Sequence, residues 1–517
     1  MKVAALLAFL LCFGTAALAA SPAEPRVWAP ATVTPGLTIQ QRLDLESSGN
    51  RLAAAHRAFE AGDFAAVLRL AQPLAEAGIA NAQVGLGRLY GTGAGVERDD
   101  EEALKWYRLA AEQGDVEGMN SLAYKLQYSD PPLQDYVEAR GWYARAAGEG
   151  SLPAAFNLAL MMLDGLGGER DFAEAKRLLE AAASGGHYAA MTMLGNIFRE
   201  GRDVPADYAA ALRWYGPAAE SGNVLALYGL GIMQLNGQGL PADPRAALGS
   251  FKRASSTGHA MSEFQIGAIY DQGLGVERDE AEAKNWYRRA AEKGAVAAMV
   301  NLGLVYGRAG DWNEAVKWLR PAADAGAAVA QLALGESYEF GRGVERDFTE
   351  AAIWYERASL QGLARAQSAL AGAYYNGRGV AQDIVRAREL YAEAAKAKIA
   401  FAQWMYGYML AEGIGGPAEL AEGLDLIRLR AEAGLPNAMH VLGVHYANGE
   451  GVRRDLVQAY QWLTLAVRNY PESSPQRADA LRTANQILLR LSVDQTRQAE
   501  AFVAGWQPTL EPAAGAN

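Results

Sequence analysis

In residues 259–273, HAMSEFQIGAIYDQG, apolar side chains recur at the spacing of an α-helix. Gly273 and Gly275 follow, and glycine readily adopts the left-handed conformation that ends a helix. Asp279 then provides a helix N-cap, and Glu282 stands three residues later, where its carboxylate can reach back to the cap amide. The pattern predicts one helix, a glycine-containing loop and the beginning of a second helix.

The second predicted helix covers residues 280–294, EAEAKNWYRRAAEKG, and ends at its final glycine. Ala283, Trp286, Ala290 and Ala291 fall on or near one face of it, so the two helices form a hairpin with an apolar interior. The closing glycine returns along the chain, in steps of 36 residues with one step of 32 and one of 72, at Gly78, Gly114, Gly150, Gly186, Gly222, Gly258, Gly294, Gly326, Gly362 and Gly434. Lys398 occupies the midpoint of the longest step. A repeat of this length predicts an all-α fold, a right-handed α-solenoid of about twelve helix–loop–helix repeats.

In many repeats the first helix has a glycine at one fixed position and the second helix has a tryptophan at another. One position of the first helix holds Gly87, Gly195, Gly231, Gly267, Gly303, Gly335 and Gly443. Glycine inside a helix costs about 1 kcal/mol relative to alanine, so its recurrence indicates close approach of the partner helix. We expect the bulky counterparts in the core to be Trp106, Trp142, Trp214, Trp286, Trp318, Trp354 and Trp462.

The repeat unit resembles the Sel-one-like repeat, a subclass of the tetratricopeptide superfamily. The resemblance rests on the pattern A-x-x-x-L-G-x-x-Y, then G-x-G-V-x-x-D, then A-x-x-W-Y-x-x-A-A-x-x-G, which residues 79–114 show in full. It covers eleven units over roughly residues 79–468. The phrase AGDF at 61–64 matches AGDW at 309–312, so residues 51–78 are expected to form a further, tetratricopeptide-like hairpin.

The two ends of the chain depart from the repeat. Residues 1–19 have the charged start, short apolar run and small-residue cleavage site of a secretory signal peptide, and contain the single cysteine, Cys12. Residues 20–50 are rich in proline and are predicted to be a flexible tether. Residues 471–506 are predicted to form two capping helices, about 474–490 and 493–505, and residues 507–517 a disordered tail.

Charge and motif content narrow the classes of function. The chain has 48 basic and 59 acidic residues and no basic run, so nucleic acid is a poor candidate partner. The five histidines are scattered, and no zinc-protease, nucleophile-elbow or P-loop motif occurs. We therefore expect a protein that is not an enzyme and that needs no cofactor or metal. We also expect no membrane-spanning segment in the predicted exported chain.

Candidate binding residues come from the first helices, which line the concave face in tetratricopeptide relatives. Two positions four residues apart vary in type from repeat to repeat, as positions that face a ligand do. The aromatic and charged residues on or near them are Tyr228, Phe264, Arg365, Tyr375, Phe401, Trp404, Tyr408 and His440. The densest group, at 401, 404 and 408, has an alternative interpretation. Residues 399–434 lack the usual Trp-Tyr pair, so these aromatics could instead refill the core.

These features support an exported scaffold, periplasmic or secreted, that binds a protein or extended peptide in the cell envelope as a monomer. Binding of a glycan or peptidoglycan is the main alternative, since the family resemblance includes envelope scaffolds linked to exopolysaccharide export. An enzyme acting on β-lactams, as suggested for some cysteine-rich members of the family, is the least favoured hypothesis because this chain lacks their disulfide pairs.

Overall fold

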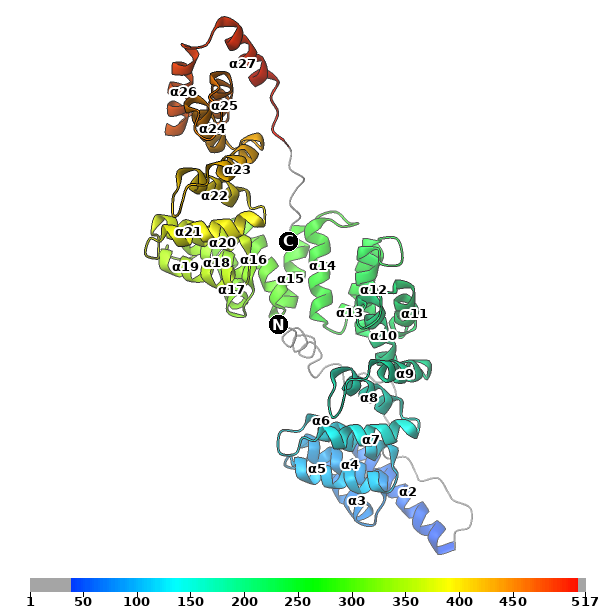
Figure 1. Ribbon diagram of the computed structural model, residues 1–517. Coiled ribbons are helices and arrows are strands. Elements are labelled where there is room, and N and C mark those ends of the chain that lie inside the picture. Colours follow the sequence, from blue (N-terminus) through cyan, green and yellow to red (C-terminus); the bar gives the residue numbers. More distant parts are fainter. Residues whose placement is uncertain (1–38, 510–517) are drawn as a thin grey trace. The chain divides into compact units, whose positions relative to one another are not determined.

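The computed structural model describes residues 39–509, which contain only α-helices and connecting loops. The helices pair into twelve successive hairpins, from α2/α3 to α24/α25, followed by two terminal helices. Figure 1 shows the hairpins following one another in chain order. Contacts divide the chain after Thr257 into two compact units of six hairpins each. The predicted all-α repeat fold is confirmed.

The helices of the first unit are α2 (Ile39–Glu60), α3 (Phe64–Glu76), α4 (Ala80–Thr92), α5 (Asp100–Glu112), α6 (Val116–Tyr128), α7 (Tyr136–Gly148), α8 (Leu152–Asp164), α9 (Phe172–Ser184), α10 (Tyr188–Glu200), α11 (Tyr208–Glu220), α12 (Val224–Asn236) and α13 (Pro244–Ser255). Those of the second unit are α14 (Ala260–Gln272), α15 (Glu280–Glu292), α16 (Val296–Arg308), α17 (Trp312–Asp324), α18 (Ala328–Phe340), α19 (Phe348–Leu360), α20 (Ala364–Asn376), α21 (Ile384–Lys396), α22 (Ala400–Glu412), α23 (Leu420–Glu432), α24 (Pro436–Asn448), α25 (Leu456–Asn469), α26 (Pro475–Leu488) and α27 (Val493–Gly505). None of these helices has the length and apolar character required to cross a membrane.

The loop between paired helices is fixed by glycines and by an aspartate cap. Gly273 and Gly275 adopt φ values of 69° and 67°, as the sequence predicts, and the Asp279 carboxylate accepts a hydrogen bond from the Glu282 amide at 2.9 Å. The expectation that Glu282 reaches back to the cap amide is wrong. That amide donates to the Tyr270 carbonyl of the preceding helix at 3.0 Å, so it is already satisfied.

The glycines of the first helices do bring the paired helices close together. A Cβ atom placed on Gly267 of α14 would lie 2.7 Å from the ring of Tyr287 in α15, which is fully buried. Equivalent contacts of 2.5–2.7 Å join Gly87 with Tyr107, Gly195 with Tyr215, Gly231 with Phe251, Gly303 with Leu319, Gly335 with Tyr355 and Gly443 with Leu463. Each of these seven hairpins is therefore closed by one large side chain against one bare backbone position.

The tryptophans are not the counterparts of these glycines, which corrects the expectation from the sequence. Adjacent helical residues point about 100° apart, so the residue after each tryptophan faces the glycine and the tryptophan lies beside it. Trp354 and Trp462 are buried, whereas Trp106, Trp142 and Trp214 are half-buried at the edge of the core.

The ends of the described chain also differ from the predicted boundaries. Residues 39–50 belong to α2, so the predicted tether 20–50 is helical in this part. The capping helices are present, and Ser492 with Gln495 forms a reciprocal capping box at α27. Residues 507–509 are not a free tail, since the Thr509 amide donates to the Glu432 carbonyl at 2.8 Å. The predicted signal peptide 1–19, the remainder of the tether and residues 510–517 lie outside the described residues.

Candidate functional site

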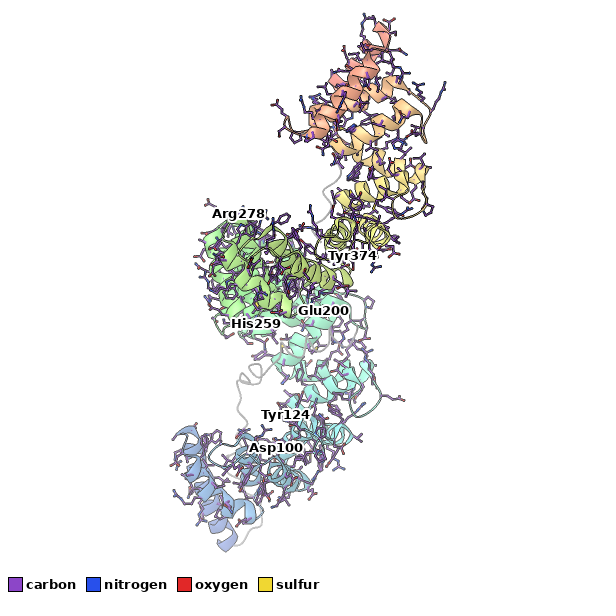
Figure 2. All side chains as sticks on the ribbon, turned by 90° about the vertical axis from the view of Figure 1, so that its left-hand side faces the viewer. Asp100, Tyr124, Glu200, His259, Arg278 and Tyr374 are labelled. Carbon is purple, nitrogen blue, oxygen red and sulfur yellow. The ribbon has the colours of Figure 1, made fainter. Side chains whose placement is uncertain are left out.

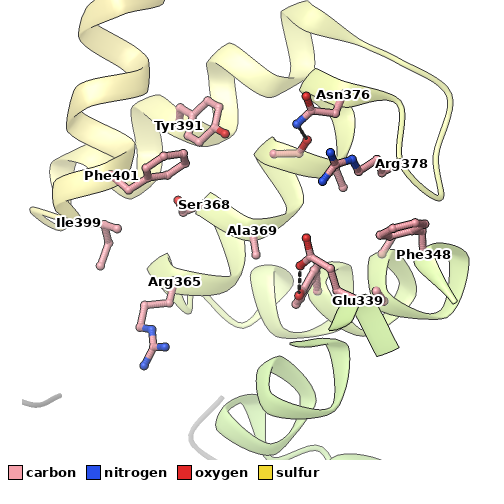
Figure 3. Close-up of a pocket in the computed structure, with 15 residues that line it drawn as sticks. Glu339, Phe348, Arg365, Ser368, Ala369, Asn376, Arg378, Tyr391, Ile399 and Phe401 are labelled. Carbon is pink, nitrogen blue, oxygen red and sulfur yellow. Dashed lines mark hydrogen bonds between the residues drawn. The ribbon is translucent and has the colours of Figure 1, made fainter. Parts of the chain in front are cut away.

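A groove of about 350 Å³ runs along α20 in the second unit. Its floor is a stripe of small residues on one face of that helix, Ser368, Ala369, Gly372 and Ala373. Helices α18 and α19 supply one wall, and α21 with the beginning of α22 supplies the other. Figure 3 shows Ser368 and Ala369 between Phe401 and Tyr391 on one side and Glu339, Phe348 and Arg378 on the other.

Two of the predicted binding residues, Phe401 and Arg365, line this groove. The Phe401 ring is 55% exposed and meets Tyr391 edge-on, with 6.1 Å between ring centroids. The Arg365 side chain is 68% exposed, and its guanidinium lies 3.5 Å from the Glu336 carboxylate. Both side chains are therefore accessible to a ligand.

Trp404 and Tyr408 lie in a different environment from Phe401. The Trp404 ring is only 7% exposed and stacks on Tyr408 with 5.5 Å between centroids. It belongs to a core cluster that continues into α23, α24 and α25. Tyr408 is half-buried, and burial, with smaller contributions from Glu412 and Tyr375, raises the pKa of its phenol. The alternative interpretation, that these aromatics refill the core, therefore fits Trp404 but not Phe401.

The remaining predicted residues do not line the groove. Tyr375 is half-buried against the core around α19–α21. His440 is half-buried with its ring edge-on to Tyr470, and burial lowers its pKa while Asp479 acts in the opposite direction. Tyr228, in the first unit, and Phe264, in the second, are half-buried and pack against aromatic rings of their own hairpins, Phe251 and Tyr287.

Several groove residues were absent from the sequence prediction, namely Glu339, Phe348, Tyr355, Arg378 and Tyr391. Glu339 lies on a first helix but outside the two variable positions, and the other four lie on second helices or in a loop, which the prediction did not include. A usable signal was present in the variable positions themselves, because Ser368 and Gly372 are both small in the same repeat. Two adjacent small residues on a ligand-facing stripe indicate a depression in the surface.

A second pocket of about 400 Å³ surrounds Asp271 near the end of α14. The Asp271 carboxylate accepts two hydrogen bonds from Arg308, at 2.7 and 3.0 Å, and its carbonyl accepts one from Arg278 at 2.9 Å. Figure 2 labels Arg278 at this end of the hairpin and His259 at the opposite end. Because its charged groups already pair with each other, this pocket is a weaker candidate for a ligand site than the groove.

Three ionisable side chains outside the two pockets, Glu263, His187 and His259, have structural partners. Glu263 is fully buried in α14 and accepts hydrogen bonds from Arg289 and Lys293 at 2.7 Å each. His187 and His259 cap α10 and α14, with their ring nitrogens accepting backbone N–H groups. Within residues 39–509 no group of three or more His, Cys, Asp or Glu side chains is arranged to hold a metal ion.

The succession of helical hairpins places this protein in the class of α-solenoids. The Sel1 repeat pattern matches eleven consecutive segments, at residues 80–115, 116–151, 152–187, 189–223, 224–259, 260–294, 296–326, 328–363, 364–398, 400–435 and 436–469. The chain therefore belongs to the Sel1 repeat family. Repeats of this family are typically non-enzymatic scaffolds that mediate interactions between proteins.

The chain is similar to solved structures of repeat proteins. A protective antigen of uropathogenic Escherichia coli strains, which displays an SLR fold, is 29% identical and covers 85% of this chain and 94% of its own, with a TM-score of 0.68. A Sel1 repeat protein from Oxalobacter formigenes is 31% identical and covers 47% of this chain and 99% of its own, with a TM-score of 0.43. A comparison with curated proteins found no match.

Proposed function

We propose that this Sel1 repeat protein is an exported, non-catalytic scaffold that binds a protein partner on the first-helix surface around α20 and α22. The observation that carries the proposal is the exposure of Phe401. Its ring stays 55% exposed beside a groove, although Trp404, one turn further along α22, is buried. Exposed aromatic rings and arginines beside a depression are the usual anchors of protein interfaces.

The partner is tested by crosslinked pull-down from an envelope extract, with the exported chain as bait. Phe401→Ser removes the exposed ring. Leu489→Ser is the matched control, because Leu489 is 88% exposed in the segment that joins α26 to α27. Trp404 is unsuitable for this test, since its loss would leave a cavity in the core.

We expect one protein to be enriched by the wild type and by Leu489→Ser and to be lost with Phe401→Ser, while all three baits keep the same melting temperature. Identical proteins on all three baits would place the interface elsewhere. If no bait enriches a protein, the scaffold proposal fails, and binding to a glycan array becomes the next test.

Export is tested separately from binding. The support for it is the order of Lys2, the apolar run 3–13 and the small residues Ala17 and Ala19. A tagged full chain, expressed in a Gram-negative host and fractionated, is expected outside the cytoplasm with an N-terminus at Ala20. Leu10→Arg, which places a charge in the apolar run, should leave an uncleaved chain in the cytoplasm. Cytoplasmic retention of the wild type would refute export.

A further inference from the structure

The groove over α20 lies where two positions that hold larger side chains in the neighbouring repeats hold small residues. The equivalents of Ser368 and Gly372 are Leu332 and Glu336 in the preceding repeat and Trp404 and Tyr408 in the following one. In that following repeat the two rings stack on each other over the same part of the hairpin. The groove has a volume of about 350 Å³, and no side chain of its own helix fills it.

The walls of the groove are suited to an apolar occupant. Phe348 and Tyr355 come from α19, and Tyr391 and Phe401 from α21 and α22. The Tyr355 hydroxyl donates to the Glu339 carboxylate at 2.6 Å, so both polar groups are already partnered within the wall. The surface left for a guest consists mainly of ring faces and edges, which pack best against an aromatic or large aliphatic side chain.

Two exposed arginines lie at the groove, with the carboxylates of Glu336 and Glu339 near them. The Arg365 side chain is 68% exposed and has one ion pair, at 3.5 Å with Glu336. Arg378 is exposed, and its guanidinium lies over the Phe348 ring, 5.9 Å from the centroid. Within residues 39–509 Arg378 has no carboxylate partner. Accessible guanidinium groups form strong hydrogen bonds with carboxylates, and here Glu339 is the only acidic group in the lining.

We propose that the groove over α20 binds an extended peptide segment of a partner protein, in which one large apolar side chain is flanked by acidic residues. The apolar side chain occupies the space above Ser368 and Gly372, between Phe401 and Phe348. The acidic residues on either side of it pair with Arg365 and Arg378. This inference rests on the proposed function, since it names the chemistry of the partner that the scaffold would hold.

The test uses a phage-displayed library of random decapeptides, which is selected in parallel on the full exported chain and on its Gly372→Leu variant. The peptides enriched on the two proteins are then compared. A Cβ atom at Gly372 would lie 3.4 Å from the Tyr391 hydroxyl, an ordinary contact, so leucine can enter the helix and fill the groove. Ala268→Leu is the matched control, because Ala268 holds the same repeat position in α14. Thermal melting followed by circular dichroism confirms that each variant is folded.

Selected peptides should share one aromatic or large aliphatic residue with Asp or Glu on both sides. A synthetic peptide of this kind should bind Gly372→Leu about tenfold more weakly than the wild type and should bind Ala268→Leu equally well. An Arg365→Gln/Arg378→Gln variant should lose similar affinity and most of the salt dependence. The inference is overturned if no sequence distinguishes the wild type from Gly372→Leu, or if peptides with basic flanks bind equally well.

Failure of this inference and failure of the proposed function give different results. If Gly372→Leu still captures the envelope partner that Phe401→Ser loses, the scaffold binds a protein but not through this groove. If the acidic peptides bind as expected while no envelope protein is enriched, the inferred binding preference of the groove is supported and the proposed scaffold function is refuted.

Discussion

At the scale of single residues, Lys398 is the clearest departure from the repeat. It stands where other repeats have the closing glycine, and its φ is 61°, in the left-handed region. A residue with a Cβ atom pays roughly 1–2 kcal/mol for this conformation, whereas glycine does not. We expect Lys398→Gly to increase the free energy of unfolding of the second unit by about 1 kcal/mol, measured by urea titration.

The control for this substitution is Lys396→Gly. Lys396 ends α21 two residues earlier, and a glycine there lowers helix propensity without relieving any left-handed backbone. It should therefore leave stability unchanged or decrease it. Equal effects of the two substitutions would contradict the strain argument.

Glu117 gives a second prediction at this scale, on the dependence of stability on pH. It lies in the first turn of α6, its side chain is 22% exposed, and its carboxylate is 3.4 Å from the Arg88 guanidinium. Burial raises the pKa of Glu117 to about 7; Asp115 also raises it, and Arg88 lowers it.

The sign of the effect follows from proton binding. In the unfolded chain the carboxyl group has a pKa of about 4.3, so between that value and 7 the folded protein holds a proton that the unfolded chain has released. The stability of the first unit should therefore fall as pH rises through this window. Glu117→Gln should remove this loss of stability. Its free energy of unfolding should be about 2 kcal/mol higher than that of the wild type at pH 8, and no higher at pH 4. Glu97→Gln, at an exposed loop position, should leave the pH profile unchanged.

At the scale of elements, the contact between glycine and a large side chain that closes seven of the hairpins can be tested inside one of them. A Cβ atom on Gly231 of α12 would lie 2.6 Å from the Phe251 ring, whereas one on Gly249 of α13 would have no atom within 4 Å. Both glycines are helical, so alanine improves helix propensity at both positions by about 1 kcal/mol. Overpacking, which costs about 1–3 kcal/mol, should outweigh this gain only at Gly231.

We therefore expect opposite signs, with Gly231→Ala destabilising and Gly249→Ala stabilising, in thermal and urea unfolding of the full chain. A stabilising Gly231→Ala would mean that the ring of Phe251 moves aside without cost, and that the recurrent glycine does not serve close packing.

The hairpins could be predicted from the sequence because several independent signals agree on them. Helical periodicity, the loop glycines and the aspartate caps mark the same boundaries, and they recur in most of the eleven matched repeats. The residue that packs on the glycine could not be predicted, since Trp286 and Tyr287 are adjacent and both large. Only the rotation of the helix about its axis decides which of them faces the partner.

The candidate site could be predicted only in part, for a related reason. Aromatic residues at variable positions indicate either an interface or a core, and the sequence contains both Phe401 and Trp404 within one turn. The groove itself depends on the small size of Ser368 and Gly372 and on walls contributed by neighbouring helices. A search for conspicuous residues does not find such a depression.

At the scale of the whole molecule, stability should be local. In an array of repeats each hairpin contacts its sequence neighbours, so a destabilising change spreads only as far as the interfaces between hairpins carry it. The division after Thr257 leaves six hairpins on either side. Gly231→Ala, in the first unit, and Trp404→Ala, in the second, are therefore expected to weaken different parts of the chain. Trp404→Ala should cost about 3–5 kcal/mol, because the ring is buried.

Amide hydrogen exchange measured by mass spectrometry can locate each effect along the chain. Gly231→Ala should speed exchange mainly in α10–α13, and Trp404→Ala mainly in α20–α25, with the other unit unchanged in each case. Phe401→Ala, at an exposed position, should change exchange little beyond α22 and serves as the control. A uniform loss of protection over both units would instead show that all twelve hairpins unfold as one cooperative body. Nearest-neighbour packing would then not describe how this solenoid is held together.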